Sequence, residues 1–178
     1  MDISRISASL EGVEDAADLP VEKWHPTHCG KMDLVIREDG AWIHEGTPIG
    51  RPALVRLLSR VLRKDEDGYV LVTPVEKISI EVEDVPFLVV DIDREGELLR
   101  ARTNVGDEAL IGPDHPLEMR AGDDGDDAPR PYVRIRGDLW ARFARPAYYR
   151  LINEESWEKD GSLYVSSAGL DYELGAVA

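Results

Sequence analysis

The chain has 178 residues, 43% of them hydrophobic, which is enough to bury a core without disulfide or metal cross-links. Its 36 acidic and 21 basic residues give a net charge of −15, which repels nucleic-acid phosphates and anionic lipid over most of the surface. One cysteine cannot close an internal disulfide, and no apolar stretch approaches the about 20 residues that span a bilayer. Because the first 20 residues also lack the pattern of a secretory signal, we expect a cytoplasmic protein that binds neither nucleic acid nor membrane.

The N-terminal part combines an acidic arm with a hairpin. Residues 1–23 are polar and predict an arm or a short helix ahead of the folded part. From Asp33, two short strand-like runs flank the pair Asp39-Gly40, which is a strong hairpin signal.

A helix is predicted to follow this hairpin. Pro52 stands at a favourable first helical position, and apolar residues recur after it at helical spacing. Arg60, Arg63 and Lys64 are predicted to end the helix, where positive charge complements the helix dipole.

Strand-like segments dominate the rest of the chain. The runs YVLVT, KISIEVE and PFLVVDI predict three strands, the last a candidate buried strand, and GELLRART, EALI and PLEMR predict three more. A loop with four aspartates between Asp123 and Asp127 follows. Its spacing lacks the alternating ligands and the closing glutamate of a calcium loop, so we interpret it as a solvated hairpin tip.

The segment after this loop repeats the first hairpin and helix. The repeat predicts that residues 139–143 form the second strand of a hairpin and that a helix begins only at Pro146, although this segment alone resembles one helix. Residues 33–63 and 132–153 should therefore superpose. The matched positions are Ile36 with Ile135, Arg37 with Arg136, Gly40 with Gly137, Trp42 with Trp140, and Arg51-Pro52-Ala53 with Arg145-Pro146-Ala147.

The motifs WHPTHCGKMD, DGAWIHEGTPIGR, DGYVLVTPVEK, TNVGDE, PLEMR, PYVRIRG and RPAYYRLI follow one another along the chain. Through these motifs the chain resembles the bacterial domain-of-unknown-function family 1285 over about residues 24 to 168. The resemblance implies two domains that arose by duplication, with a C-terminal half loosely like a pleckstrin-homology fold. It also implies a nucleotide-like ligand between the domains and a role in signalling, and it supplies no catalytic residues.

The pattern as a whole predicts an α+β fold of two related units, each a small antiparallel sheet with a helix. We expect an N-terminal arm at residues 1–23, a first repeat domain at 24–95 and a second at 96–178.

His25, His28 and Cys29 form the best candidate metal cluster, since imidazole and thiolate are good zinc ligands. A closed site needs four ligands, and the other two histidines are remote in sequence, so we expect no metal and no cofactor. Cys29 beside His28 has the composition of a nucleophile and its base, but no third orienting group or oxyanion motif accompanies them. An enzyme acting through this pair is the least favoured function.

Two polar turns offer donors and acceptors to a ligand. Thr73 and Glu76 close one strand, and Thr103, Asn104 and Asp107 form a second turn with a glycine. These residue types also satisfy ordinary turns, and that alternative needs no function.

Arginine supplies the strongest functional signal. Eleven of the 21 basic residues lie in the two segments 51–64 and 130–150, and the first of these contains no acid. Ten of the eleven are arginines, whose planar guanidinium can bind a phosphate through two hydrogen bonds, although pairing with the many carboxylates would explain such runs without a ligand. The two Arg-Pro pairs place Arg51 and Arg145 at helix N-termini, which favour anions.

We therefore predict a non-catalytic binding or sensing module for a small anionic, nucleotide-like ligand where the two repeats meet. The alternative is a protein interaction scaffold without a small ligand, whose partner the sequence does not identify. The predicted ligand-binding residues are Arg51, Thr73, Glu76, Thr103, Asn104, Asp107, Arg136 and Arg145.

Overall fold

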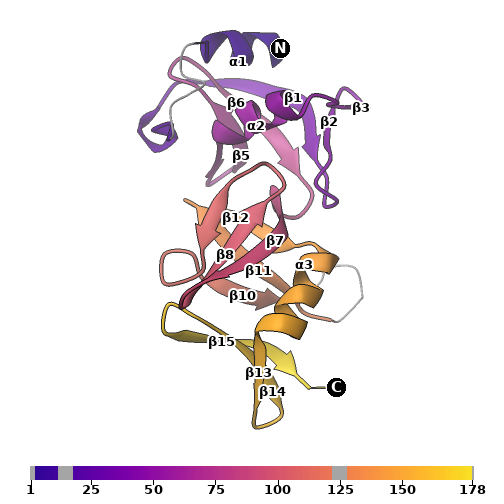
Figure 1. Cartoon of the computed structure of the whole chain (residues 1–178). Helices are drawn as coiled ribbons and strands as arrows, with labels where there is room; N and C mark the ends of the chain where they lie inside the picture. Colours follow the sequence, from indigo (N-terminus) through magenta and orange to yellow (C-terminus); the bar gives the residue numbers. More distant parts are fainter. Residues whose placement is uncertain (1–2, 12–17, 122–127, 178) are drawn as a thin grey trace. The chain divides into compact units, whose positions relative to one another are not determined.

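The computed structural model describes residues 3–11, 18–121 and 128–177, and it forms two compact units, Met1–Pro86 and Phe87–Ala178 (Figure 1). The division predicted after residue 95 differs from this one. It would separate β7 (Phe87–Glu95) from β8 (Leu98–Thr103), which pair with each other as an antiparallel hairpin. The aspartate-rich segment 123–127 lies outside the described residues.

Unit 1 contains two α-helices, a short 3-10 turn and six strands among its described residues. These elements are α1 (Ile3–Ser9), η1 (Val21–Lys23), β1 (His28–Ile36), β2 (Trp42–His44), β3 (Thr47–Pro48), α2 (Pro52–Arg60), β4 (Leu62–Asp65), β5 (Gly68–Val72) and β6 (Lys77–Val82).

The predicted hairpin and helix start are confirmed in unit 1. β1 and β2 pair antiparallel around the Asp39-Gly40 turn, and Gly40 takes the positive φ of 86° that the turn requires. α2 begins at Pro52, as predicted, but ends at Arg60. The prediction that Arg63 and Lys64 end this helix is therefore wrong, because both residues lie in β4.

Arg63 explains why the chain leaves the helix so early. Its guanidinium is buried, and it donates to the two carboxylate oxygens of Asp65 over 2.6 and 3.1 Å. It also donates to the backbone carbonyls of Val21 and Trp24 over 2.7 and 2.8 Å. These partners are available only when Arg63 is part of a strand, so Arg63 fastens the segment around η1 to β4.

The described residues of unit 2 form nine strands and one α-helix that continues as a short π-helix. These elements are β7, β8, β9 (Glu108–Leu110), β10 (Leu117–Arg120), β11 (Arg130–Arg136), β12 (Leu139–Phe143), α3 (Arg145–Arg150), η2 (Leu151–Glu155), β13 (Ser156–Lys159), β14 (Ser162–Ser167) and β15 (Leu170–Ala176).

The six-stranded sheets of the two units share one topology. In unit 1 the strand order is β3-β2-β1-β6-β5-β4, and in unit 2 it is β10-β11-β12-β7-β8-β9. If the six strands of each sheet are numbered 1 to 6 in chain order, both sheets have the order 3-2-1-6-5-4, with the second sheet read from β9 to β10. The first and last strands meet at the centre and pair parallel, whereas the other neighbours pair antiparallel. The two six-stranded sheets are thus mixed, and the prediction of antiparallel sheets is wrong for the central pair of each sheet.

The predicted sequence repeat is confirmed in its local order only. β11 and β12 form a hairpin, residues 139–143 are a strand, and α3 begins at Arg145, one residue earlier than predicted. The repeat nevertheless aligns strands one and two of unit 1 with strands five and six of unit 2. The tryptophans also differ in register, since Trp42 lies opposite Ile36 and Trp140 lies opposite Arg134.

Both units are rich in sheet and contain few helices, so the predicted α+β class holds only in the coarse sense of two duplicated sheet-bearing units. β7, predicted to be buried, alternates instead: Phe87, Val89 and Ile92 are buried, but Val90 is 46% exposed. None of the helices in the described ranges is long and apolar enough to cross a membrane.

The C-terminal strands β13, β14 and β15 form a separate sheet that one buried serine fastens to the rest of unit 2. Ser167 Oγ accepts from the backbone N–H of Leu99 over 2.8 Å and donates to the carbonyl of Ile111 over 2.7 Å. Ala168 N–H donates to the carbonyl of Glu97 next to this contact. The small sheet therefore has one fixed face on β8 and one outer face.

Arg63→Ala should lower the free energy of unfolding by about 3 kcal/mol, because it leaves Asp65 and two backbone carbonyls without their buried donor. Urea denaturation followed by circular dichroism measures this loss. Lys64→Ala is the matched control, since the ammonium of Lys64 only lies over the Tyr69 ring, 5.0 Å from its centroid, and its loss should cost about 0.5–1 kcal/mol. Equal urea midpoints for the two variants would contradict the role given to Arg63.

Stability at low pH should depend on Asp65. The hydrogen bond from Arg63, and after it the one from Lys77, outweigh desolvation and lower the pKa of Asp65 to about 2, from an ordinary 3.8. Since the folded-state pKa is the lower one, the stabilisation is present above pH 4 and is lost as the pH falls from 4 towards 2. The difference in unfolding free energy between wild type and Asp65→Asn should therefore shrink over that interval, and a constant difference would refute this coupling.

Candidate functional site

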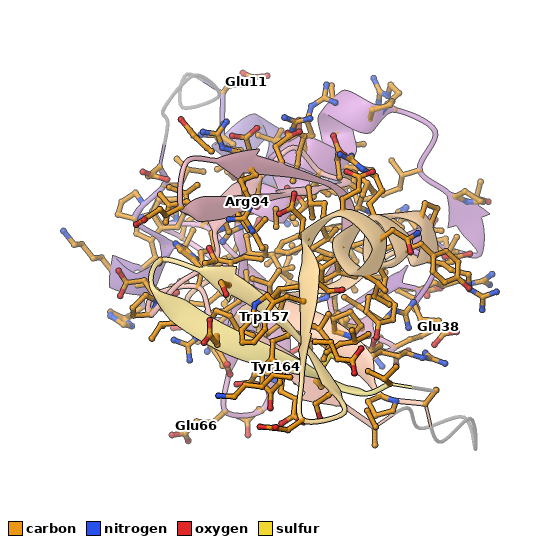
Figure 2. All side chains as sticks on the ribbon, turned by 60° about the horizontal axis from the view of Figure 1, so that its bottom comes forward. Glu11, Glu38, Glu66, Arg94, Trp157 and Tyr164 are labelled. Carbon is orange, nitrogen blue, oxygen red and sulfur yellow. The ribbon has the colours of Figure 1, made fainter. Side chains whose placement is uncertain are left out.

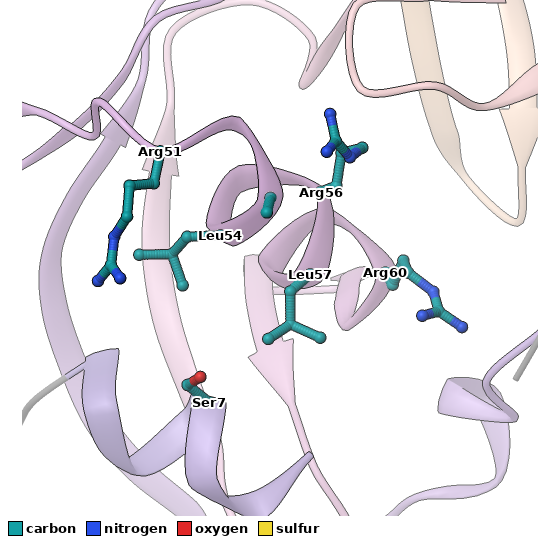
Figure 3. A pocket seen from close by; sticks show the side chains of 7 residues that line it. Ser7, Arg51, Leu54, Arg56, Leu57 and Arg60 are labelled. Atoms are coloured by element: carbon teal, nitrogen blue, oxygen red, sulfur yellow. The ribbon is translucent and has the colours of Figure 1, made fainter. Parts of the chain in front are cut away.

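A cavity of about 490 Å³ lies along α2 (Figure 3). Its volume falls within the range of about 300–1,000 Å³ that is usual for small-molecule sites. The described lining residues all belong to unit 1, and they are Ser7, Arg51, Ala53, Leu54, Arg56, Leu57 and Arg60. We call this cavity the α2 pocket.

Helical spacing explains how the α2 pocket combines apolar and charged side chains. Leu58 and Ser59 are buried, whereas Leu54, one turn before Leu58, and Leu57 are half-buried and line the pocket at the edge of the buried face. In Figure 3, Leu54 and Leu57 extend towards α1, which contributes Ser7. α1 is itself anchored, since its apolar side chains Ile3 and Ile6 are buried.

The three arginines surround this apolar surface instead of converging on one point. Figure 3 shows the guanidinium of Arg51 on the same side of α2 as Leu54, whereas Arg56 extends away from α1 and Arg60 points past the far end of the helix. Arg51 itself has extended backbone just before Pro52, which places its side chain at the helix N-terminus. A ligand that fills the pocket would meet positive charge at its edges and leucine at its centre.

The described residues that line the α2 pocket include no carboxylate, which is unusual in this acidic chain. By contrast, a cavity of about 690 Å³ in the same unit includes Asp33, Glu81 and Glu83. Another, of about 460 Å³, is lined by four acidic residues, Glu22, Asp65, Glu66 and Asp67. Within the described ranges, the guanidinium groups of Arg51 and Arg56 make no ion pair. The charged side chains in the described lining of the α2 pocket are therefore all arginines.

The predicted ligand residues Thr73 and Glu76 bond to each other within a turn. Thr73 N–H donates to the carbonyl of Glu76 over 2.8 Å, and Glu76 N–H donates to Thr73 Oγ1 over 3.2 Å. Both residues are buried. The threonine hydroxyl therefore serves the connection between β5 and β6.

The structure brings together four other predicted residues, Thr103, Asn104, Asp107 and Arg136. Thr103 Oγ1 accepts from Asp107 N–H over 3.0 Å, which closes the turn between β8 and β9. Asn104 exchanges two hydrogen bonds with the backbone of Leu88, its Oδ1 accepting over 3.0 Å and its N–H donating over 2.9 Å. Arg136 Nε lies 3.7 Å from Asp107 Oδ2. These polar groups are occupied in holding strands of unit 2 together.

Arg145 is exposed at the first residue of α3, and no salt bridge or side-chain hydrogen bond of Arg145 is found in the described part of unit 2. Other arginines of this unit are paired: Arg94 with Glu155, Arg102 with Asp91, Asp93 and Glu108, and Arg150 with Asp91 and Glu154. The hydrogen bond that Arg102 donates to Glu108 raises the pKa of Arg102, and the one that Arg150 donates to Glu154 raises the pKa of Arg150. Pairing with carboxylates thus accounts for these three arginines.

The candidate metal cluster is not assembled by the side chains that the structure describes. His28 Nε2 lies 2.9 Å from Ser79 Oγ on the neighbouring strand, and His25 is exposed. Within the described residues, no group of three histidine, cysteine or acidic side chains could hold a metal ion. The side chain of Cys29 lies outside the described part.

Arg51 is a predicted ligand-binding residue that lies in the α2 pocket, and its neighbours there were not among the predicted residues. Arg56 and Arg60 were grouped with the basic segment, and their spacing of four residues on a helix was the available signal. Leu57 carried a similar signal, because it lies three residues before Arg60 and so neighbours it on the helix surface. Ser7 carried none, since its position depends on how α1 packs.

The fold and the order of its motifs define a protein of two duplicated, sheet-rich units. The family described as Domain of unknown function (DUF1285), N-terminal domain, matches residues 19–85, and the family described as Protein of unknown function (DUF1285), C-terminal domain, matches residues 86–174. The chain belongs to the DUF1285 family.

Two solved structures of this family are similar to the chain. The crystal structure of a DUF1285 family protein from Silicibacter pomeroyi is 39% identical, covers 97% of this chain and 95% of its own, and has a TM-score of 0.86. The crystal structure of a DUF1285 family protein from Shewanella baltica is 30% identical, covers 69% of this chain and 92% of its own, and has a TM-score of 0.57. No curated protein matches the chain.

Asn104→Ala should lower the free energy of unfolding by about 1 kcal/mol, because the Leu88 N–H at the start of the central strand β7 loses its acceptor. Asn104→Asp keeps an acceptor at Oδ1 and should retain most of the stability. Thermal melts of the two variants measure the difference. Equal losses would show that the hydrogen bond to Leu88 is not what stabilises the turn.

Proposed function

We propose that this protein is a non-catalytic binding or sensing module for a small anionic molecule of the nucleotide or phosphorylated-metabolite class, held in the α2 pocket. Ligand occupancy, not turnover, would be its output. The observation that carries the proposal is a ligand-sized cavity whose described lining contains three arginines and no carboxylate, in a chain of net charge −15.

Electrostatics decides which anions are suitable. A long polyanion would extend over the acidic remainder of the surface and be repelled, whereas a small molecule can stay within the reach of the pocket arginines. Guanidinium groups suit phosphate because they offer two parallel donors. Arg51 also lies at the N-terminus of α2, where the helix dipole is positive. Leu54 and Leu57 offer an apolar surface to the uncharged part of the same ligand.

Three further parts of the proposal come from the sequence and the family resemblance. They are a cytoplasmic location, a role in signal transduction, and a pleckstrin-homology-like character of the C-terminal unit. The predicted contribution of Arg145 belongs with them, and the experiment below includes it.

A phosphate-bearing ligand at 100 times its dissociation constant should stabilise the fold by about 2.7 kcal/mol, which raises the melting temperature by several degrees. A panel of nucleotides and phosphorylated metabolites, screened by differential scanning fluorimetry, measures this shift. Arg51→Ala should remove most of it, because losing a charged hydrogen-bond donor costs about 1.5–3 kcal/mol of binding.

Arg37→Ala is the matched control, because it removes the same charge from an exposed position of unit 1 outside the α2 pocket, and it should keep the full shift. Arg145→Ala tests the second half: loss of the shift would extend the site to α3, and a full shift would confine it to unit 1. If no member of the panel moves the melt by as much as about one degree, the anion proposal fails and the interaction scaffold becomes the better function. Native mass spectrometry of the freshly purified protein provides an independent test, since a retained ligand would be detected by its mass.

A further inference from the structure

An aromatic pair lies on the outer face of the C-terminal sheet. Trp157 on β13 and Tyr164 on β14 are direct cross-strand partners, and their rings stack with centroids 5.1 Å apart and planes 25° from parallel. Figure 2 brings this sheet forward and shows the two side chains next to each other. Trp157 is 37% exposed although it is a large hydrophobic residue. Exposed tryptophans are frequent anchors of protein interfaces, so this one needs an explanation.

The indole of Trp157 is held in one orientation. Its Nε1–H donates to Ser166 Oγ over 2.9 Å, and Ser166 Oγ donates in turn to Asp171 Oδ1 over 2.6 Å. The stack on Tyr164 fixes the same ring from one side. A ring fixed in this way loses little conformational freedom when a partner binds, which favours recognition.

One face of the indole is left for a partner. The sheet order is β13-β14-β15, so β13 is an edge strand, and no strand within the described residues pairs with its outer side. Since Tyr164 on β14 covers the inner face of the indole, the other face points towards this edge. An incoming chain can reach it without displacing any part of the sheet.

The chemistry around the pair favours a cation. Residues 153–177 contain six acidic side chains and one basic side chain, Lys159, which lies two residues after Trp157 on the same face of β13. Two of the acids lie on the same face of the sheet, because Glu173 pairs with Tyr164 and Asp171 pairs with Ser166. The face of an indole ring attracts positive charge, and neighbouring carboxylates strengthen that attraction.

A second tryptophan of unit 2, Trp140, makes cation–π contacts with arginines of the same unit. Trp140 has the guanidinium of Arg120 over its ring at 4.2 Å and that of Arg134 at 5.5 Å. No cation of the described residues lies over Trp157 in this way. Trp157 is thus a cation–π acceptor whose cation the described part of the chain does not provide.

We propose that Trp157, Tyr164, Asp171 and Glu173 form a docking surface for a basic, extended segment of a partner protein. An arginine of that segment stacks on the outer face of Trp157, and its charge lies beside Glu173. Arginine fits better than lysine, because its planar guanidinium stacks on aromatic rings. This surface lies wholly in unit 2 and does not depend on the α2 pocket.

The test uses the whole protein and a fluorescein-labelled pentapeptide of alternating threonine and arginine, with binding followed by fluorescence anisotropy. Trp157→Leu should weaken binding about 5- to 30-fold, which corresponds to about 1–2 kcal/mol. This variant keeps the apolar bulk and the net charge, so it isolates the aromatic ring from general attraction to an acidic chain. Trp157→Phe keeps a ring and should bind with intermediate affinity.

Two further arms examine the charge. The same peptide with citrulline in place of arginine, which is nearly isosteric but neutral, should not bind the wild-type protein. Glu173→Gln should weaken binding of the arginine peptide, whereas Glu66→Gln, an equal change of charge at an exposed position of unit 1, should leave it nearly unchanged.

The outcomes separate the explanations. Equal binding to wild type and Trp157→Leu means non-specific attraction to an acidic chain and overturns the proposal. Equal binding of the citrulline peptide means apolar docking and also overturns it, as does a lack of any binding. If circular dichroism shows that Trp157→Leu does not fold, the citrulline peptide and the two glutamate variants still decide the question.

Discussion

Each six-stranded sheet depends on one parallel strand pair, which is β1 with β6 in unit 1 and β7 with β12 in unit 2. The antiparallel neighbours within each set of three strands are local in sequence, and turns set their register. The parallel pair is different, because it joins the first strand of a six-stranded sheet to the last strand of that sheet and requires a crossover. In unit 1 this crossover contains α2, whereas in unit 2 α3 follows the last strand. The helix therefore occupies a different position in the two units, although the sheets share one topology. The α2 pocket lies along the helix that belongs to a crossover.

Features that depend on local chemistry could be predicted from the sequence. Asp39-Gly40 is sufficient for a hairpin, Pro52 for a helix start, and the comparison of related segments was sufficient to identify residues 139–143 as a strand. The end of α2 could not be predicted in this way, since Arg63 finds its partners at Val21 and Trp24, about 40 residues earlier. The parallel strand pairs were not predicted for the same reason, because no local sequence pattern marks which two distant strands become neighbours. The repeat was real in its local order but misplaced within the shared topology.

The candidate site was predicted less completely than the fold, for a reason that lies in the residue types themselves. Threonine, asparagine and aspartate suit both ligands and turns, and in Thr73, Thr103 and Asn104 the structure uses them for turns and strand pairing. Arginine was a better signal where the segment itself contained no acid. That condition holds around α2, but elsewhere acids distant in sequence reach the arginines, as Asp91 reaches Arg150. Composition within a segment therefore predicts charge reliably only when the fold brings no acid from elsewhere.

The two proposed surfaces respond differently to the charge of the whole chain. A ligand of the α2 pocket must overcome repulsion by a net charge of −15 until it reaches the arginines, so short-range contacts with Arg51 and with Leu54 must provide its affinity. A basic segment approaching Trp157 is attracted from a distance, and the aromatic ring and Glu173 then determine where it binds. Salt weakens the binding of the basic segment twice, because it screens both the long-range attraction by the net charge and the local attraction by Glu173. For the anion, salt also screens the long-range repulsion, which offsets part of the lost local attraction. The steeper salt dependence thus belongs to the aromatic surface, although the pocket contains more charged side chains.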